Sequence, residues 1–158
     1  MESVARTLDS RAATEKFGAA LGALLMPGDC VGLTGDLGAG KTFLTRAVCK
    51  GAGLPDDVYV ASPTFALIND YRGARLPLLH VDLYRIVDRS DLYALGWDDL
   101  VESGAALIVE WADRVTDALP PHALWIHLEV GDAEDARRLT LRAQAGRGLT
   151  LVAELSRM

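Results

Sequence analysis

Apolar residues recur at helical spacing in several parts of the chain. Ser10 is a suitable N-cap, and it is followed by apolar side chains spaced along one helix face, at Ala13, Phe17, Ala20, Leu21 and Leu24. This pattern predicts a first helix that ends near Pro27-Gly28. Helices are also predicted at residues 42–49, at residues 90–100 with an interruption near Gly96, and in the tail at residues 149–155.

Other segments are continuously apolar or alternate, as strands do. The apolar runs at 30–34 and 105–109 predict buried strands that are covered on both faces. Residues 62–71 and 76–84 predict one antiparallel hairpin, and residues 124–130 with 139–143 predict a second. This order of elements predicts a single α/β domain over residues 1–158: a P-loop NTPase-like fold whose mixed sheet has a parallel core, antiparallel edge hairpins and flanking helices.

Composition fits one ordinary domain. The chain has 158 residues, half of them hydrophobic and about a quarter charged, which is enough to form a core without metals or disulfides. Because no stretch has the length of a membrane span and no secretory pattern is visible, we expect a cytoplasmic protein without membrane contact. Cys30 and Cys49 form no metal-ligand pattern and fit reduced core thiols.

The charge balance argues against a large nucleic-acid footprint. The formal net charge is −6, and only three lysines occur, Lys16, Lys41 and Lys50. Affinity for RNA depends on clustered Lys and Arg that neutralise phosphates. We therefore do not expect stable RNA binding by this chain alone.

One octapeptide carries the clearest chemistry. Positions 35–42 read Gly-Asp-Leu-Gly-Ala-Gly-Lys-Thr and match the phosphate-binding pattern G-x-x-x-x-G-K-[ST]. The three glycines allow backbone angles closed to other residues, so that successive N–H groups can converge on one anion. Lys41 can reach the outer phosphates, and the Thr42 hydroxyl suits a Mg²⁺ ion between them. The strand before the loop and the helix after it favour this interpretation over a plain glycine-rich turn.

Two acids are candidates for a metal-binding or catalytic role beside the loop. Glu110 ends the apolar run at 105–109, where the carboxyl end of a strand meets the ligand crevice of an open α/β sheet. Asp82 lies in the strand at 76–84, whose alternation places three apolar residues on one face and His80, Asp82 and Tyr84 on the other. Asp82 can hold a metal-bound water or orient an attacking one. The alternative is a solvated outer face.

Two further features lie near these acids. Ser-Pro-Thr-Phe at 62–65 follows the phosphate-binding helix, and Thr64 is a candidate switch residue that contacts the γ-phosphate or the metal. Trp111 directly follows Glu110, where its indole either reports nucleotide state or belongs to the core.

Taken together, these motifs resemble the TsaE (YjeE) family of small bacterial P-loop ATPases in tRNA threonylcarbamoyladenosine synthesis. The matching blocks are the octapeptide at 35–42, Ser-Pro-Thr-Phe at 62–65, His-Val-Asp-Leu-Tyr-Arg at 80–85 and Val-Glu-Trp at 109–111. They occur in order and at compatible spacing along nearly the whole chain.

The resemblance implies ATP and Mg²⁺ as ligands and a weak Mg²⁺-dependent ATPase activity. Lys41, Asp82 and Glu110 are then the catalytic residues, and Thr42, Asp82 and Glu110 are the metal-side residues. The implied nucleotide contacts are those of the loop, its flanks and the two chain ends: Ser10, Gly35, Asp36, Leu37, Gly38, Ala39, Gly40, Lys41, Thr42, Phe43, Thr64 and Arg138, with Arg137 as the alternative to Arg138.

The resemblance also implies a partner. It suggests binding to the TsaB–TsaD heterodimer, with ATP hydrolysis to ADP resetting that complex between cycles of threonylcarbamoyl transfer to adenosine 37, and with tRNA contacted only through the partners. Two alternatives stay open: a small-molecule kinase on the same fold, and a nucleotide-gated binding module whose hydrolysis is incidental. A kinase needs an acceptor pocket and usually a lid that supplies arginines; Arg72, Arg75, Arg85 and Arg89 are the arginines near the middle of the chain.

Overall fold

A seven-stranded mixed sheet runs through the molecule in the computed structural model, which describes residues 2–63, 67–115 and 117–158. Its strands are β1 (Glu2–Leu8), β2 (Cys30–Gly35), β3 (Ile68–Tyr71), β4 (Leu78–Asp82), β5 (Ala106–Glu110), β6 (Leu124–Val130) and β7 (Arg137–Ala143). They lie in the order β1-β7-β6-β2-β5-β4-β3. Strands β6, β2, β5 and β4 are parallel, whereas β7, β1 and β3 join antiparallel at the two sides. The predicted parallel core with antiparallel edges is confirmed.

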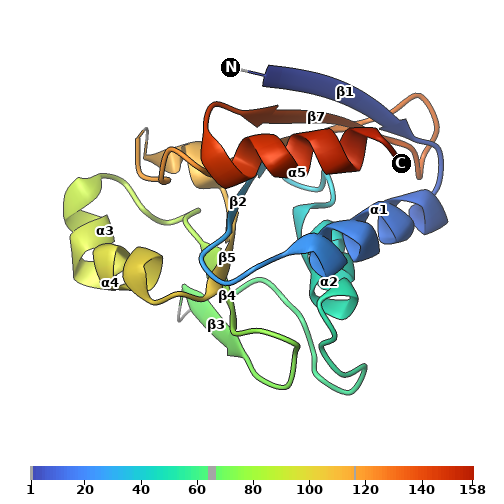
Figure 1. Cartoon of the computed structure of the whole chain (residues 1–158). Coiled ribbons are helices and arrows are strands. Elements are labelled where there is room, and N and C mark those ends of the chain that lie inside the picture. Colours follow the sequence, from blue (N-terminus) through green and yellow to red (C-terminus); the bar gives the residue numbers. More distant parts are fainter. Residues whose placement is uncertain (1, 64–66, 116) are drawn as a thin grey trace.

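Helices cover both faces of this sheet. They are α1 (Arg11–Leu24), α2 (Lys41–Gly51), α3 (Arg89–Leu95), α4 (Trp97–Glu102) and α5 (Gly146–Ser156). Figure 1 shows the middle strands nearly edge-on, with α1 and α2 on one side and α3 and α4 on the other. Two buried apolar clusters correspond to these layers. One includes Phe17, Leu44 and Leu151 from α1, α2 and α5, and the other includes Leu92 and Trp97 from α3 and α4.

Helices α1 and α2 pack closely against each other near the C-terminal end of α2. A Cβ atom added to Gly22 would clash with the Val48 carbonyl oxygen, and one added to Gly51 would clash with the Ala19 carbonyl oxygen. Both clashes are with backbone atoms, which cannot move without shifting a whole helix. The two glycines therefore let the helices approach closely, and α1 holds α2, whose first residues, Lys41 and Thr42, are the last two of the phosphate-binding loop.

The element boundaries agree with the sequence pattern in most places. The Ser10 hydroxyl accepts a hydrogen bond from the Ala13 amide and caps α1, as predicted. Gly96 adopts a left-handed conformation with φ 80° and separates α3 from α4. Several boundaries differ: β3 begins only at Ile68, β4 spans Leu78–Asp82 rather than 76–84, β7 begins at Arg137 rather than at residue 139, and α5 is longer than expected.

Strand β1 was not predicted at all. It pairs with β7 along its whole length, from Glu2 opposite Ala143 to Leu8 opposite Arg137. The Arg6 guanidinium donates a 2.7 Å hydrogen bond to the Leu155 carbonyl oxygen and so ties β1 to α5. The N-terminal segment therefore closes one side of the sheet and leads directly into α1.

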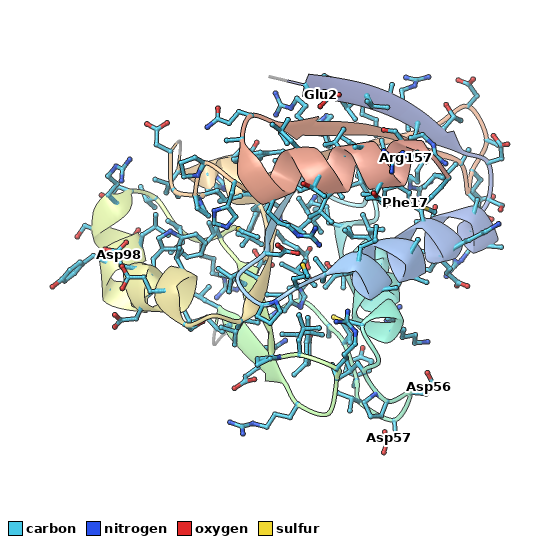
Figure 2. All side chains as sticks on the ribbon, viewed as in Figure 1. Glu2, Phe17, Asp56, Asp57, Asp98 and Arg157 are labelled. Carbon is cyan, nitrogen blue, oxygen red and sulfur yellow. The ribbon has the colours of Figure 1, made fainter. Side chains whose placement is uncertain are left out.

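Many of the acidic residues lie at the surface. Figure 2 shows Asp56 and Asp57 at the outer end of the segment after α2, and Asp98 on α4, away from the core in which Phe17 is buried. Within the described part of the chain, no helix is both long and apolar enough to cross a bilayer. The net negative charge is thus carried largely by solvated side chains, as expected for ionised groups.

Candidate functional site

The octapeptide forms a loop between β2 and α2, at the carboxyl ends of the parallel strands. Gly35, Gly38 and Gly40 have φ angles of 140°, 84° and 105°, which other residues rarely adopt. Gly40 is the N-cap of α2, and no side chain caps this helix end. The first N–H groups of α2 therefore remain available to an anion, and the helix dipole adds partial positive charge there.

The other loop residues divide between the surface and the core. Asp36 and Leu37 are exposed at the tip, and Leu37 keeps 82% of its surface accessible. Ala39 is buried, and its amide donates to the Asp36 carbonyl oxygen at 3.0 Å, which closes the turn. The loop is thus anchored by Ala39 and presents its tip to solvent.

Lys41 lies under the loop rather than extending from it. Its ammonium donates to the carbonyl oxygens of Gly35 at 2.7 Å and Asp36 at 2.9 Å, and lies 4.1 Å from the Trp111 ring centroid. Burial lowers the pKa of this ammonium, while the nearby carboxylates oppose that shift, in the order Glu110, Asp113, Asp82 and Asp36. The arrangement places one buried cation where a phosphate chain would meet the loop.

Thr42 connects α2 to the end of β5. Its hydroxyl donates to the two carboxylate oxygens of Glu110, at 3.0 and 3.2 Å, and lies 2.6 Å from the Ser62 hydroxyl. Because that single proton is directed to the carboxylate, Ser62 is the donor in the second contact. The structure therefore brings together Thr42, Glu110 and the start of the 62–65 motif. Thr64 itself lies outside the described residues.

Asp82 lies beside Glu110 at the carboxyl ends of the parallel strands. The two acids are register partners at the ends of the parallel strands β4 and β5. Burial raises the pKa of Asp82, the hydrogen bond from the Tyr84 amide at 2.8 Å opposes the shift, and the charge of Glu110 reinforces it. This carboxylate is held in an environment that favours accepting a proton, which is a property of functional acids.

The polar face of β4 is not a solvated outer face, so that alternative is wrong. His80 is fully buried, and Asp82 is only 9% exposed. Leu78, on the same face of β4, belongs to the apolar cluster that includes residues of α1 and α2, so this face is covered. Tyr84, beyond the end of β4, is the exception and is 48% exposed. The predicted split is otherwise correct, since Val81 and Leu83 belong to the apolar cluster on the α3–α4 side, with Leu79 packed against it.

Trp111 has an unusual backbone for a bulky residue. Its φ angle is 56°, in the left-handed region, where such a residue is strained by about 1–3 kcal/mol. The indole is half-buried, with Lys41 near its ring and Tyr84 at a centroid distance of 4.9 Å. Trp111 packs against the core and also contacts Lys41 below the loop, so it lies both at the core boundary and at the site.

A cavity of about 160 Å³ adjoins the loop on the α1 side. It is lined by residues from α1, α2 and the start of β7, namely Arg11, Thr14, Gly40, Phe43, Asp135 and Arg137. The Arg11 guanidinium lies 4.8 Å from the Phe43 ring centroid, and Arg137 Nε donates to the Ala39 carbonyl oxygen at 2.8 Å. An aromatic ring and two arginines thus line the cavity, a combination that suits a planar ring system attached to an anionic group.

The structure distinguishes the two arginines that the sequence offers as nucleotide contacts. Arg137, not Arg138, reaches the loop, because Arg137 shares a face of β7 with the buried Leu139 and Leu141, whereas Arg138 is exposed on the other face. Ser10 uses its hydroxyl to cap α1, and its neighbours Arg11 and Thr14 line the cavity instead. Both cavity residues were missed, although they occupy one face of the first turn of the predicted helix.

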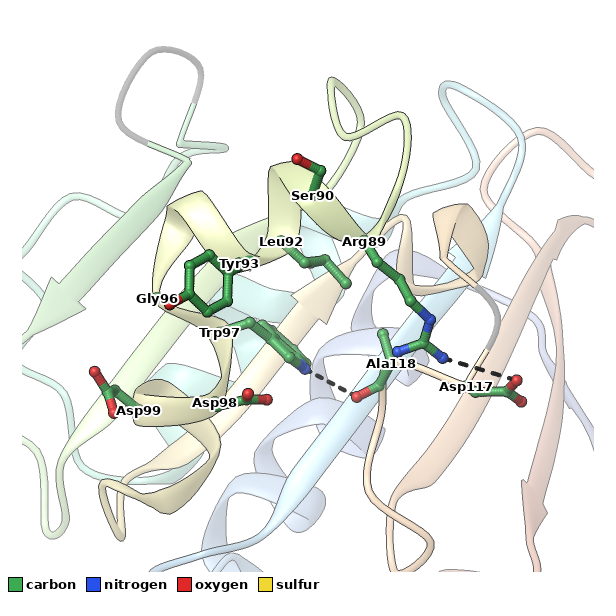
Figure 3. A pocket seen from close by; sticks show the side chains of 10 residues that line it. All are labelled: Arg89, Ser90, Leu92, Tyr93, Gly96, Trp97, Asp98, Asp99, Asp117 and Ala118. Atoms are coloured by element: carbon green, nitrogen blue, oxygen red, sulfur yellow. Dashed lines mark hydrogen bonds and ion pairs between the residues drawn. The ribbon is translucent and has the colours of Figure 1, made fainter.

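A larger cavity, of about 760 Å³, lies on the opposite face of the sheet between α3, α4 and residues 117–118. Figure 3 shows Trp97 Nε1 donating to the Ala118 carbonyl oxygen, at 2.9 Å, and Arg89 paired with Asp117 at 3.9 Å. None of the residues predicted for the site lines this cavity. Its volume alone is therefore not a reason to place the chemistry there.

The donors beside the loop fit Mg²⁺. Over the described ranges, no three side chains of His, Cys, Asp or Glu gather as a metal cage. Mg²⁺ does not need one, because it keeps several waters and is usually held by one or two carboxylates together with substrate phosphates. Thr42, Glu110 and Asp82 supply such a set of oxygens.

Comparison with known proteins identifies relatives. The family model "Threonylcarbamoyl adenosine biosynthesis protein TsaE" matches residues 8–139. A TsaE from Bacillus subtilis is 40% identical over 85% of this chain and 82% of its own length, and one from Treponema pallidum is 37% identical over 74% and 84%. The crystal structure of Bacillus subtilis YdiB superposes with a TM-score of 0.79 at 32% identity, covering 99% of this chain and 95% of that one.

Proposed function

The chain belongs to the TsaE family, whose members take part in tRNA threonylcarbamoyladenosine biosynthesis, and from this premise we propose that it is a Mg²⁺-dependent ATPase of that process. The observation that carries the proposal is the contact of the Thr42 hydroxyl with the Glu110 carboxylate, at 3.0 Å, directly beside the phosphate-binding loop. This contact joins the two metal-side groups of a P-loop NTPase at one point.

Each residue of the site has a task that follows from its position. The loop amides and Lys41 bind the phosphate chain, and the cavity beside Phe43 and Arg137 takes the nucleoside end. Bound Mg²⁺ would neutralise charge on the outer phosphates. Thr42 and Glu110 would hold it, and the Asp82 carboxylate would orient the attacking water.

The proposal extends to partners and place of action. We infer that hydrolysis acts on the TsaB–TsaD heterodimer and resets it between cycles of threonylcarbamoyl transfer, and that tRNA is contacted through those partners. The net charge of −6 supports the indirect role in RNA binding. Burial raises the pKa of Cys30 and of Cys49 to about 12, so both free thiols are inert. Free buried thiols support a cytoplasmic place of action.

The kinase alternative is less well supported. Two of its four candidate arginines have other tasks: Arg75 donates to the carbonyl oxygens of Gly22 and Leu25 at the end of α1, and Arg72 lies near Asp70 on the surface. Incubation with Mg²⁺-ATP and a panel of metabolites separates the two functions. Release of phosphate without a phosphorylated acceptor supports the ATPase, and a phosphorylated metabolite would identify a kinase.

Replacing Lys41 tests the loop itself. Lys41→Met keeps the length of the side chain and removes the charge, so ATP loses charge-assisted hydrogen bonds worth about 1.5–3 kcal/mol each, or about 10–100-fold in Kd. Lys50→Met, which alters an exposed lysine at the other end of α2, is the matched control. Calorimetric titration should show weak ATP binding only for Lys41→Met. Equal affinity in both variants would contradict the assignment of the loop.

A further inference from the structure

His80 lies at the centre of a buried hydrogen-bonded chain that ends at the metal-side acid. Its Nδ1 is 3.0 Å from the Tyr71 hydroxyl, and its Nε2 is hydrogen-bonded to Glu110 Oε2. The imidazole is completely buried, and its ring lies 5.9 Å from the Tyr71 ring at an angle of 37°. Strands β3, β4 and β5 are adjacent in the sheet, so one residue from each forms the chain.

We propose that His80 is a positioning residue for Glu110, with Tyr71 fixing the imidazole from the other side, so that the carboxylate is held ready for Mg²⁺. This inference rests on the proposed ATPase function. With its proton on Nε2, the imidazole can donate to the carboxylate and accept from the Tyr71 hydroxyl through Nδ1. Both nitrogens are then satisfied, and rotation of the ring would break both bonds.

Packing alone does not explain why these three hydrogen-bonded side chains are buried together. Burying an imidazole, a phenol and a carboxylate in one place costs free energy that apolar side chains of similar volume would not. Such a cost is expected where the orientation of a carboxylate is needed for function, because a carboxylate with only some of its hydrogen bonds could rotate. Here the carboxylate is that of Glu110, which also accepts the hydrogen bond from Thr42 at 3.0 Å.

The other end of the chain reaches the segment before the predicted switch. The Asn69 side-chain amide donates to the Ala61 carbonyl oxygen at 3.0 Å. Asn69 Nδ2 is also 3.3 Å from the Tyr71 hydroxyl. Tyr71 is therefore held by its surroundings, which makes it a rigid support for His80.

The effect of His80 should appear in the response to Mg²⁺. Loss of an outer partner of a metal ligand typically weakens metal binding about 10–100-fold. Mg²⁺ should increase the affinity for ATP, and the quantity to compare is the Mg²⁺ concentration at half of this increase. For His80→Ala we expect that concentration to rise at least about tenfold, while ATP binding without Mg²⁺ is unchanged. His80→Gln, whose amide can donate to Glu110, should restore most of the response, and Tyr71→Phe should give an intermediate shift.

Calorimetric ATP titrations over a series of Mg²⁺ concentrations measure this, with the folded state of each variant checked by circular dichroism. His122→Ala is the matched control, since His122 contacts the Gly28 carbonyl oxygen away from the site. An unchanged Mg²⁺ response in His80→Ala overturns the inference, as does an equal loss of ATP binding with and without Mg²⁺.

Two further outcomes are decisive. If His80→Ala does not fold, a near-normal His80→Gln together with a shifted Tyr71→Phe supports the inference, and any other pattern in those two variants overturns it. If the unaltered protein binds no ATP at any Mg²⁺ concentration, the proposed function itself fails. If it binds ATP in a Mg²⁺-dependent way and His80→Ala does the same, only the role of His80 fails.

Discussion

Gly35 should be far less replaceable than Gly38, although both belong to the same loop. A Cβ atom on Gly35 would lie 2.5 Å from the Leu128 carbonyl oxygen, whereas nothing lies within 4 Å of one on Gly38. Leu128 is the register partner of Gly35 in β6, so its carbonyl cannot retreat without disturbing the sheet. The comparison of Gly35→Ala with Gly38→Ala therefore isolates the close approach of the loop to the sheet.

The expected magnitudes follow from the backbone angles and this contact. For Gly38→Ala, the left-handed conformation costs about 1–2 kcal/mol, less about 0.4–1 kcal/mol gained because the unfolded chain is less free. For Gly35→Ala, a glycine-only conformation costs about 1–3 kcal/mol, and the backbone clash adds about 1–3 kcal/mol. Because the gain from the less free unfolded chain is the same for both variants and cancels, we expect Gly35→Ala to lose about 2.5 kcal/mol more stability than Gly38→Ala, a Tm difference of roughly 5–10 °C.

Urea unfolding followed by circular dichroism measures the two free energies of unfolding, and thermal scans give the two Tm values. Unequal losses in the expected direction support the position of Gly35 against β6. Equal losses would refute the reasoning, because the φ cost alone would then explain both variants.

Further predictions concern the acids and the nucleoside end. Asp82→Asn keeps the acceptor for the Tyr84 amide but removes the buried charge, so ATP should still bind while hydrolysis falls. Because the folded-state pKa of Asp82 is raised above its unfolded value, ionised Asp82 reduces stability once the pH is above that pKa. Asp82→Asn should therefore raise the Tm of the protein without ligands at pH 7, and the gain should vanish in acid; a lower Tm at pH 7 would contradict this. As the pH is lowered, the ATPase activity of the unaltered protein should also fall at a higher pH than an Asp with an ordinary pKa would give. If the residual activity of Asp82→Asn falls at the same pH, the fall belongs to another group. Finally, Arg137→Ala should weaken ATP binding by about 1.5–3 kcal/mol, whereas Arg138→Ala should leave it unchanged; the reverse order in a titration would restore the original prediction.

Local pattern was enough to predict most of the fold. Each predicted helix and each predicted hairpin is present, because apolar spacing, an N-cap at Ser10 and a break at Gly96 are properties of neighbouring residues. Strand β1 escaped prediction because its sequence alternates only weakly, with Val4 and Leu8 as its larger apolar residues. Its structure comes from pairing with β7, more than a hundred residues away.

The parts of the site that lie in a local sequence motif could be predicted, whereas the parts formed by contacts between distant segments could not. The loop, Glu110 and Asp82 follow motif and strand-end rules, and the structure brings them to one edge of the sheet. Burial of His80 and its support by Tyr71 depend on which strands are neighbours in the sheet. The alternation of side chains along one strand does not contain that information. The choice of Arg137 over Arg138 did have a local signal, since Arg137 shares the parity of the buried Leu139.

Phosphate release from Mg²⁺-ATP, with and without the purified TsaB–TsaD heterodimer, tests the central claim most directly. Glu110→Gln is the matched variant, because it keeps the size of the side chain and an acceptor for Thr42 but removes the charge at the metal side. We predict slow release by the unaltered protein alone, strong stimulation by the heterodimer, and little release from Glu110→Gln in either case. Release that the heterodimer leaves unchanged, or that Glu110→Gln retains in full, would contradict a partner-dependent ATPase built on this site.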